Sequence, residues 1–470
     1  MKMLIAGNWI DRDERIEVRN PFDDSVIDTI PSAEASDIEQ ALESARRGFE
    51  DMRLLSAKQR SDILGNAAKL LEDRPEQLVT TLAKEVGKTI SEAKTEVTRA
   101  IQTLTISAEE AKRISGETVP FDATSGAETK FGFYIRVPVG TILAITPFNV
   151  PLNLACHKVA PAIAAGNSVI LKPSTATPLA DLMLGEVLLE AGLPPEGLNI
   201  ITGRGEVTGK PLVSDPRVRM VTFTGSPNVG ETIAQMAGLK KTAMELGSNS
   251  CAIVMEDADV REAARRIRIG GYAIAGQVCI SVQRVIVHER VYDSFLEEFL
   301  PLVANIRTGN QLDESTDMGP MISEEAAKRV ETWIEEATRS GAKAALPIER
   351  QGTVLKPTVL TDVPLDAKVW TEEVFGPLVS VVKCRDFDHA LELANASKYG
   401  LQAGIFTTNL NYALRAVREI DVGGVMVNEI PTFRIDAMPY GGVKMSGFGR
   451  EGPKYAIEEM TELRLVGFQM

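Results

Sequence analysis

The spacing of apolar residues changes twice along the chain. From about residue 36 to residue 116, apolar positions recur at intervals of three and four, a period that predicts amphipathic helices. Ser36 with the following Asp has the chemistry of a helix start. Ser56, followed three residues later by Gln59, predicts a second start with a capping box. The N-terminal quarter of the chain is therefore expected to be largely helical.

From residue 140 to residue 247, short apolar runs alternate with helical segments. Four of these runs predict buried parallel strands, at residues 140–145, 168–171, 198–201 and 220–223. Helices are expected between them, for example after Pro178 and after Pro227. A second alternation extends from about residue 250 to residue 440. This order predicts an α/β fold whose open sheet can bind a dinucleotide.

Two further segments are expected to be strands outside these alternations. Residues 131–137 alternate between apolar and other positions, and residues 462–468 resemble an edge strand. An unpaired edge strand exposes backbone groups that pair with other chains. We therefore expect the second strand to need a partner, and the two segments together to contribute to an oligomer interface.

Composition excludes several classes of function. The chain has 470 residues, of which 44% are hydrophobic and 25% charged, as in an ordinary globular protein of two or more domains. Its net charge of −14 argues against nucleic-acid binding, because phosphate contacts need clustered Lys and Arg. No apolar run approaches the roughly 20 residues of a membrane helix, so no membrane partner is expected.

Cysteine and histidine usage predicts a reduced, cytoplasmic, metal-free protein. Four cysteines in so long a chain do not suggest a disulfide framework, and none has Cys-x-x-Cys spacing. Three histidines, at positions 157, 288 and 389, make no ligand cluster. The first residues turn polar too soon for a signal peptide.

The most informative chemical pattern surrounds Cys279, which follows Gly-Gln-Val. A cysteine among apolar residues is usually inert, and a glutamate is usually solvated. Glu245 nevertheless precedes this cysteine in the sequence Glu-Leu-Gly, and a thiol with a carboxylate can form and hydrolyse a thioester. Asn149 lies between Pro147 and Pro151, which predict a loop, and its amide suits an oxyanion hole.

These motifs, in this order, resemble those of the aldehyde dehydrogenase superfamily, NAD(P)-dependent enzymes that oxidise aldehydes to carboxylic acids. The resemblance covers nearly the whole chain. It implies a Rossmann-like NAD(P)-binding domain, an α/β catalytic domain and a small β oligomerisation element, in a homodimer or homotetramer. The implied boundaries are 1–116 and 139–246 for the cofactor domain, with 441–457 packing back on it, 247–440 for the catalytic domain, and 117–138 and 458–470 for the oligomerisation element.

The resemblance also implies a role for each candidate catalytic residue. Cys279 is the nucleophile, Asn149 donates to the oxyanion together with the Cys279 N–H, and Glu245 activates the deacylating water. Branches that pass the acyl group to coenzyme A commonly lack this base, so Glu245 favours hydrolysis. Ser248 stands where the family commonly has a second glycine of this motif.

Cofactor residues are implied in the same way: Lys172, Ser174 and Thr175 at the adenine ribose, Gly225 and Ser226 at the pyrophosphate, and Glu373 and Phe375 at the nicotinamide ribose. NAD-preferring members often have Glu where this chain has Thr175. A neutral side chain removes the repulsion of a 2′-phosphate, so the expected cofactor is NADP or NAD, with NADP accepted. The glycine-rich segment 203–209 has one residue too many for a dinucleotide fingerprint, and we set it aside.

Four residues bear on the small-molecule aldehyde that would be the substrate. Arg113 is either a solvated helix residue or an anion clamp, and its surroundings resemble those of non-phosphorylating glyceraldehyde-3-phosphate dehydrogenases. Val278 and Arg434 are similar to residues of the lactaldehyde dehydrogenase branch. His157, a polar residue where an aromatic one is frequent, indicates a hydroxylated or anionic substrate, although a lone His is more often a packed residue.

The sequence therefore predicts oxidation of a short, 2-hydroxylated or anionic aldehyde, of the lactaldehyde or glyceraldehyde 3-phosphate type. A semialdehyde dehydrogenase, such as the succinate-semialdehyde type, is the alternative, with Arg113 or Arg434 binding a distal carboxylate. A non-catalytic binding or structural protein on the same scaffold is the third. Retention of Cys279, Glu245 and Asn149 together argues against that third possibility.

Overall fold

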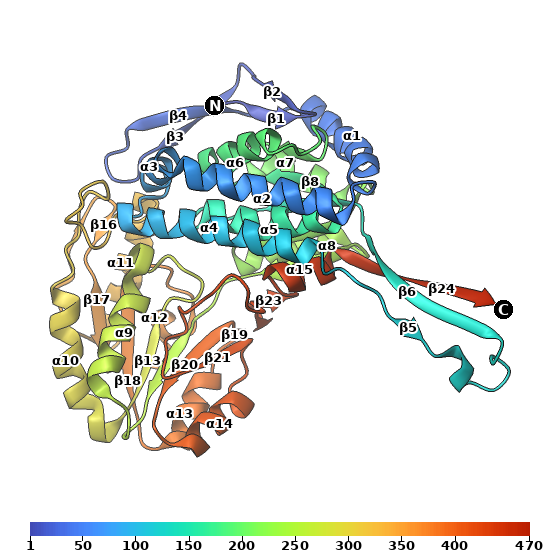
Figure 1. Cartoon of the computed structure of the whole chain (residues 1–470). Helices are drawn as coiled ribbons and strands as arrows, with labels where there is room; N and C mark the ends of the chain where they lie inside the picture. The colour runs from blue at the N-terminus through green and yellow to red at the C-terminus, as the bar shows by residue number, and fades with distance from the viewer.

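Two α/β sheets, one for each alternation in the sequence, form the body of the molecule. The computed structural model describes all 470 residues. Figure 1 shows the first sheet with its helices in the upper half and the second sheet in the lower half. None of the helices is both long enough and apolar enough to cross a membrane.

The first sheet has eight strands in the order β2-β1-β9-β8-β7-β10-β11-β23. Its central five strands are parallel, as their continuous apolar runs predict. The outer pairings, of β1 with β2 and β9 and of β23 with β11, are antiparallel. The strands are β1 (Met3–Ile5), β2 (Asn8–Ile10), β7 (Thr141–Ile145), β8 (Ser168–Lys172), β9 (Leu198–Ile200), β10 (Val218–Thr224), β11 (Lys241–Glu245) and β23 (Gly447–Phe448).

Helices cover both faces of this sheet. One face packs against α1 (Ala35–Met52), α7 (Gly205–Ser214) and α8 (Pro227–Ala237). The other face packs against a thicker helical layer: α2 (Ala57–Asp73), α3 (Pro75–Val86), α4 (Ile90–Ala111), α5 (Pro151–Ala165), α6 (Leu179–Glu190) and α15 (Pro453–Glu459). Every residue of α5 is buried, so this helix lies at the centre of that layer.

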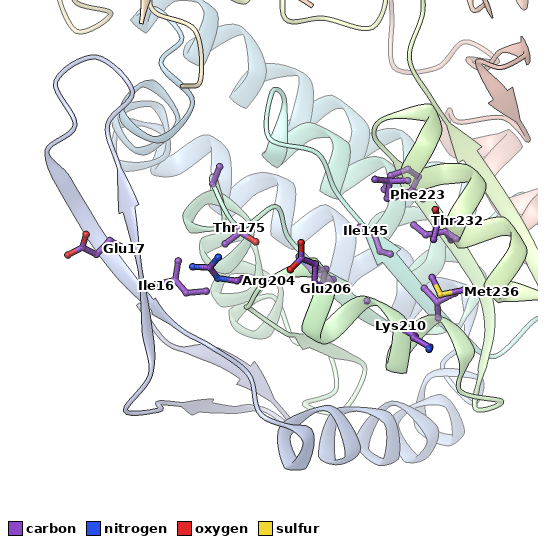
Figure 2. A pocket seen from close by; sticks show the side chains of 17 residues that line it. Ile16, Glu17, Ile145, Thr175, Arg204, Glu206, Lys210, Phe223, Thr232 and Met236 are labelled. Carbon is purple, nitrogen blue, oxygen red and sulfur yellow. The ribbon is translucent and has the colours of Figure 1, made fainter. Parts of the chain in front are cut away.

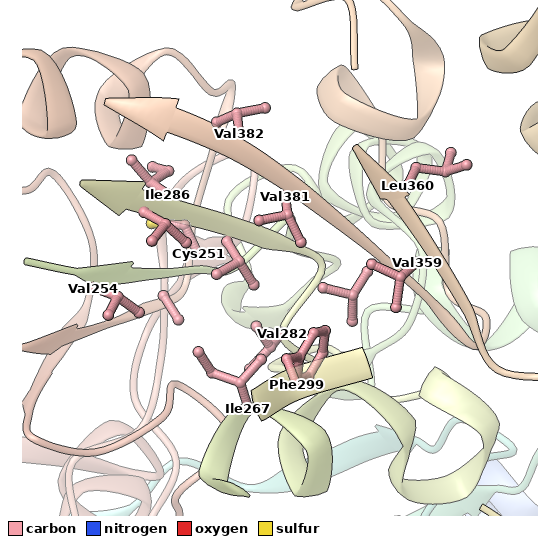
Figure 3. Packing of buried hydrophobic residues seen from close by; sticks show 14 of the residues in the cluster. Cys251, Val254, Ile267, Val282, Ile286, Phe299, Val359, Leu360, Val381 and Val382 are labelled. Atoms are coloured by element: carbon pink, nitrogen blue, oxygen red, sulfur yellow. The ribbon is translucent and has the colours of Figure 1, made fainter. Parts of the chain in front are cut away.

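The second sheet has seven strands in the order β14-β17-β18-β13-β12-β20-β21, all parallel except the edge strand β14. Its buried side chains form a separate core (Figure 3). The strands are β12 (Cys251–Val254), β13 (Arg284–His288), β14 (Lys343–Ala344), β17 (Thr358–Thr361), β18 (Leu378–Cys384), β20 (Gln402–Phe406) and β21 (Gly424–Val427). The helices are α9 (Val260–Tyr272), α10 (Tyr292–Ala304), α11 (Glu324–Arg339), α12 (Lys368–Thr371), α13 (Phe387–Asn395) and α14 (Leu410–Glu419).

A third sheet extends from the body as an arm (Figure 1). It consists of β5 (Thr118–Val119), β6 (Lys130–Pro138) and β24 (Thr461–Gln469), in the order β24-β6-β5. β24 pairs antiparallel with β6 along its whole length, so the expected edge strand finds its partner within the chain. Three small two-stranded sheets complete the fold: β3 (Arg15–Arg19) with β4 (Val26–Pro31), β15 (Arg350–Gln351) with β16 (Val354–Leu355), and β19 (Tyr399–Gly400) with β22 (Val443–Lys444).

The sequence predicted two helix starts, and the structure agrees with one of them and differs at the other. Ser56 and Gln59 form the expected capping box. The expected start at Ser36 is wrong, because α1 begins at Ala35 and Glu34 is its cap. Glu34 and Asp37 satisfy each other's backbone N–H groups, and this reciprocal pair outweighs the cap preference of Ser36.

Candidate active site

The loop that carries Cys279 has an unusual backbone. It follows α9, and Ile274, Ala275 and Gly276 are consecutive left-handed residues with φ of 51°, 52° and 71°. For a residue with a Cβ this conformation costs about 1–2 kcal/mol. Glycine is also required at position 276 for steric reasons, because a Cβ added to Gly276 would lie 2.1 Å from the Gly376 carbonyl oxygen. The strain is local and immediately precedes the cysteine.

Side chains from distant elements hold this loop. Glu92 of α4 accepts a hydrogen bond from the Ile274 N–H at 2.7 Å. The Gln277 side chain donates to the Ile274 carbonyl at 3.1 Å and accepts from the Ile322 N–H at 2.9 Å. The Asn149 amide donates to the Gln277 carbonyl at 2.8 Å. These bonds connect the first-sheet half to the loop and fix where the cysteine lies.

The Cys279 sulfur lies 2.9 Å from the Tyr440 hydroxyl oxygen. Burial raises the pKa of the thiol to about 11, while the Tyr440 hydrogen bond and the charge of Arg434 act in the opposite direction. The other three cysteines are buried, whereas Cys279 is partly exposed. The thiol is therefore the accessible one, and its ionisation depends on its neighbours.

A buried ionic network supports Tyr440 from behind. The Arg434 guanidinium carbon lies 3.7 Å from the centre of the Tyr440 ring, and Arg434 donates to Glu451 at 2.9 Å. Lys158 of α5 donates to the same carboxylate at 2.8 Å. Burial would raise the pKa of Glu451, but the two cations outweigh it and hold that pKa below its usual range. Glu451 is therefore ionised at neutral pH.

Glu245, the last residue of β11, is buried and neither of its carboxylate oxygens has a hydrogen-bond partner. Burial, helped by the nearby charge of Glu451, raises its pKa well above the usual value. A Cβ added to Gly441 would lie 2.9 Å from one of these oxygens, so the carboxyl group points towards that glycine. Burial therefore favours the uncharged form of this carboxyl group.

His157 forms a second polar cluster with Asp436. Its Nε2 lies 2.9 Å from the Asp436 carboxylate, which also accepts from Arg99 of α4 at 2.7 Å. Burial lowers the pKa of His157, so the imidazole is neutral. Its Nδ1 has no partner, and neither has Nε of Arg434. Two sequence candidates for substrate contact thus carry unused buried polar atoms.

Arg113 lies elsewhere. It follows the end of α4, its side chain is 59% exposed, and it pairs with Glu109 and Glu110 of the same helix. None of its hydrogen bonds is to a residue near Cys279. The geometry favours the interpretation of Arg113 as a solvated helix residue.

A cavity of about 1000 Å³ opens beside the carboxyl ends of the first sheet (Figure 2). Lys172 and Thr175 line it, and burial lowers the pKa of Lys172 to about 8. Arg204 and Glu206 also line it, and they belong to the glycine-rich segment that has one residue too many for a dinucleotide fingerprint. Lys210, which directly follows that segment, lines the cavity as well. Its size and basic lining fit a dinucleotide. Gly225 and Ser226 lie at the N-terminal end of α8 but are not among its lining residues.

Glu373 and Phe375 lie near the start of β12. Glu373 is buried, and burial raises its pKa to about 7 even though it accepts the Ser248 N–H at 2.9 Å. A Cβ added to Gly247 would meet its carboxylate at 2.2 Å. Phe375 has a left-handed backbone and contacts the edge of Phe148, with ring centres 5.8 Å apart. These residues connect the second sheet to the segment that follows Glu245.

Sequence reasoning missed several residues of this site, among them Glu92, Arg99, Lys158, Tyr440 and Glu451. One signal was present, because α5 is otherwise apolar and contains a lysine directly after His157. A charged residue in a fully buried helix needs a partner. The other partners come from segments far apart in the sequence, which no local pattern connects.

Comparison with known proteins shows the family of this chain. The profile of the aldehyde dehydrogenase family matches residues 9–466. The 3-sulfolactaldehyde dehydrogenase of Priestia megaterium is 48% identical over 464 residues, which are 99% of this chain and 97% of that protein. The lactaldehyde dehydrogenase of Methanococcus maripaludis is 40% identical over 468 residues, 99% of each.

Among solved structures, the glyceraldehyde-3-phosphate dehydrogenase of Methanocaldococcus jannaschii complexed with NADP matches with a TM-score of 0.94 and 39% identity. The match covers 98% of this chain and all of that one. The fold is that of a family of oxidoreductases that act on aldehydes with a nicotinamide cofactor. This chain belongs to the aldehyde dehydrogenase family.

Replacing Glu92 with Ala removes the acceptor of the Ile274 N–H and relaxes the left-handed turn. We expect kcat to fall about 10- to 100-fold, because small displacements of a reacting group cost that much, while cofactor affinity is retained. Steady-state kinetics and cofactor titration measure both. Glu109→Ala, an exposed position on the same helix, is the control. A kcat within twofold of the parent would show that Glu92 acts only as a helix cap.

Proposed function

We propose that this enzyme oxidises a short, 2-hydroxylated or anionic aldehyde to the carboxylic acid through a thioester on Cys279. The observation that carries the proposal is the convergence of three separate segments on one loop. Cys279 lies in the loop, Asn149 binds it from the end of β7, and Glu245 ends β11 nearby. The Glu245 carboxyl group points towards Gly441, which follows the Tyr440 that contacts the Cys279 sulfur.

In the first half of the reaction the Cys279 thiolate attacks the aldehyde carbon and forms the C–S bond. The Asn149 amide has two N–H groups and uses one for the Gln277 carbonyl. Its other N–H, with the Cys279 N–H, would stabilise the negative oxygen, a contribution of about 2.7–4 kcal/mol per donor. A nicotinamide cofactor would supply the acceptor for the hydride that leaves this carbon, and Cys279 would then carry the thioester.

In the second half, Glu245 takes a proton from water as the water attacks the thioester. The C–S bond then breaks, releasing the acid and the Cys279 thiolate. This step requires the ionised carboxylate. Because burial raises the pKa of Glu245, the ionised fraction of this base, and with it the rate of hydrolysis, should increase as the pH rises through that raised pKa.

Replacing Glu245 with Gln should stop the reaction at the thioester. We expect one equivalent of reduced nicotinamide per active site and an acyl adduct on Cys279, both measurable by rapid absorbance and peptide mass spectrometry. Cys279→Ala should show neither signal while still binding the cofactor. Continuous turnover by Glu245→Gln would contradict the role of this carboxyl group.

Two observations support the proposed class of substrate: buried polar atoms that have no partner, and the substrates for which similar enzymes are named. His157 Nδ1 and Arg434 Nε have no partner within the protein and are available to a polar substrate. Similar enzymes are named for lactaldehyde, for its sulfonated derivative and for glyceraldehyde 3-phosphate. Arg113 stays a second candidate for an anionic group, with less support because of its exposure. A semialdehyde substrate is the alternative, with Arg434 binding a distal carboxylate.

Reduced-nicotinamide formation should be compared for lactaldehyde, sulfolactaldehyde, glyceraldehyde 3-phosphate and succinate semialdehyde, without inorganic phosphate. We expect Arg434→Gln to lower kcat/KM for the anionic aldehydes at least about tenfold more than for lactaldehyde, since a buried charge pair is lost. Arg113→Gln is the matched control and should change this ratio little. An unchanged ratio in Arg434→Gln would remove Arg434 from the substrate site.

We propose further that the cavity beside Thr175 binds the adenosine part of NADP or NAD, with NADP accepted. Lys172 lines this cavity, and Arg204 and Lys210, which line it too, add positive charge. Thr175 donates to the Gly203 carbonyl at 3.0 Å and carries no charge that would repel a 2′-phosphate.

Thr175→Glu should lower the NADP-to-NAD ratio of kcat/KM at least about tenfold, because like charges at close range cost several kcal/mol. Thr232→Glu adds the same charge to the same cavity, well apart from Thr175 in Figure 2, and is the control. Equal ratios in the parent and Thr175→Glu would exclude Thr175 from cofactor selection.

The arm is proposed as the oligomerisation element of a homodimer or homotetramer. It carries exposed apolar side chains along β6 and β24: Phe131, Ile135, Leu463, Leu465 and Phe468. Such a surface on an extended sheet is typical of a contact with another chain.

A further inference from the structure

A second residue touches the reacting sulfur. The Tyr440 hydroxyl oxygen is 2.9 Å from Cys279 Sγ and is the hydrogen-bond partner that the structure gives this atom. Tyr440 is 2% exposed and packs with Ile280 and Leu401 in a small apolar cluster. Its phenol is therefore held against the thiol and shielded from water.

The backbone fixes the position of this ring. The Tyr440 N–H donates to the Glu451 carbonyl at 3.1 Å, and the Glu451 N–H donates to the Tyr440 carbonyl at 2.7 Å. The side chain of Glu451 in turn binds Arg434, whose guanidinium lies over the ring. One residue thus anchors both the phenol and the cation above it.

We propose that Tyr440, with Arg434 stacked on its ring, activates the nucleophile by donating a hydrogen bond to the Cys279 thiolate. The proposal rests on the proposed function, in which Cys279 is the nucleophile. The thiol loses its proton to solvent water and Tyr440 keeps its own. In the thiol form the same contact reverses, with the S–H as a weak donor to the phenol oxygen.

The groups around Cys279 explain why its thiolate needs the hydrogen bond from Tyr440. The other titratable groups that act on the thiol are the carboxyl groups of Glu373 and Glu245, and each disfavours a thiolate when it is ionised. Burial disfavours it too. Behind Tyr440, the charge of Arg434 is offset in part by Glu451, which Lys158 also neutralises. Tyr440 and Arg434 are therefore the groups that stabilise negative charge on the sulfur.

The test is alkylation of the enzyme by iodoacetamide, a neutral reagent, without aldehyde or cofactor. Cys156, Cys251 and Cys384 are buried, so modification should map to Cys279 by peptide mass spectrometry. A hydrogen bond to a charged acceptor is worth about one to two pKa units. We expect Tyr440→Phe to slow alkylation about tenfold or more at each pH below the thiol's midpoint. Arg434→Gln should slow it in the same direction.

Tyr292→Phe is the matched control, because Tyr292 is also a buried tyrosine under a cation, with Lys383 Nζ 4.4 Å from its ring centre, but away from the thiol. Its alkylation profile should equal that of the parent. Turnover of Tyr440→Phe should approach that of the parent as pH rises, since high pH ionises the thiol without help. A merely structural role would not produce this convergence.

Equal alkylation rates in Tyr440→Phe and Tyr292→Phe would overturn the proposal, as would a turnover deficit that is constant with pH. If the proposed function itself is wrong and Cys279 is not the nucleophile, the experiments give a different result. In that case Cys279→Ala would retain aldehyde oxidation, or the parent would not be alkylated at Cys279 at all.

Discussion

The site depends on one buried carboxylate. Glu451 accepts from Lys158 of the helical layer on the first sheet and from Arg434 of the segment after the second sheet. Its backbone pairs with that of Tyr440. Burying three charges is costly unless each is paired, and removing one partner of such a group typically costs about 3–5 kcal/mol. The two halves of the molecule are therefore connected at the point where the cysteine lies.

The rigidity of this connection has a chemical consequence. Burial raises the pKa of both the Cys279 thiol and the Glu245 carboxyl group and so favours their uncharged forms, whereas the proposed reaction uses both as anions. A site that excludes water strengthens every hydrogen bond made in it, but it also makes the ionisation of its reactive groups less favourable. Fixed donors next to the sulfur and the cations around Glu451 offset that cost. The reactivity of the site is thus set by neighbours rather than by the cysteine alone.

Backbone strain is confined to the same place. The left-handed turn at Ile274 and Ala275 is sustained by Glu92 from α4 and by Gln277, and Gly276 fits closely against the Gly376 carbonyl. Strained backbone persists where surrounding contacts over-determine it. Here those contacts come from both sheets, so correct folding of each half is required before the cysteine takes its position.

The sequence by itself determined the α/β class, the parallel strands of the first sheet and most of their bounds, because a buried strand between helices leaves a local apolar signature. It also identified the family and the motifs around Asn149, Glu245 and Cys279, since these are contiguous in the chain. Only the tertiary structure decided that Tyr440 meets the thiol with Arg434 on its ring, that Arg113 pairs with its own helix, and that the segment at Arg204 lines the cavity. Contacts between residues far apart in the chain follow from how the sheets pack, and no local pattern records that packing.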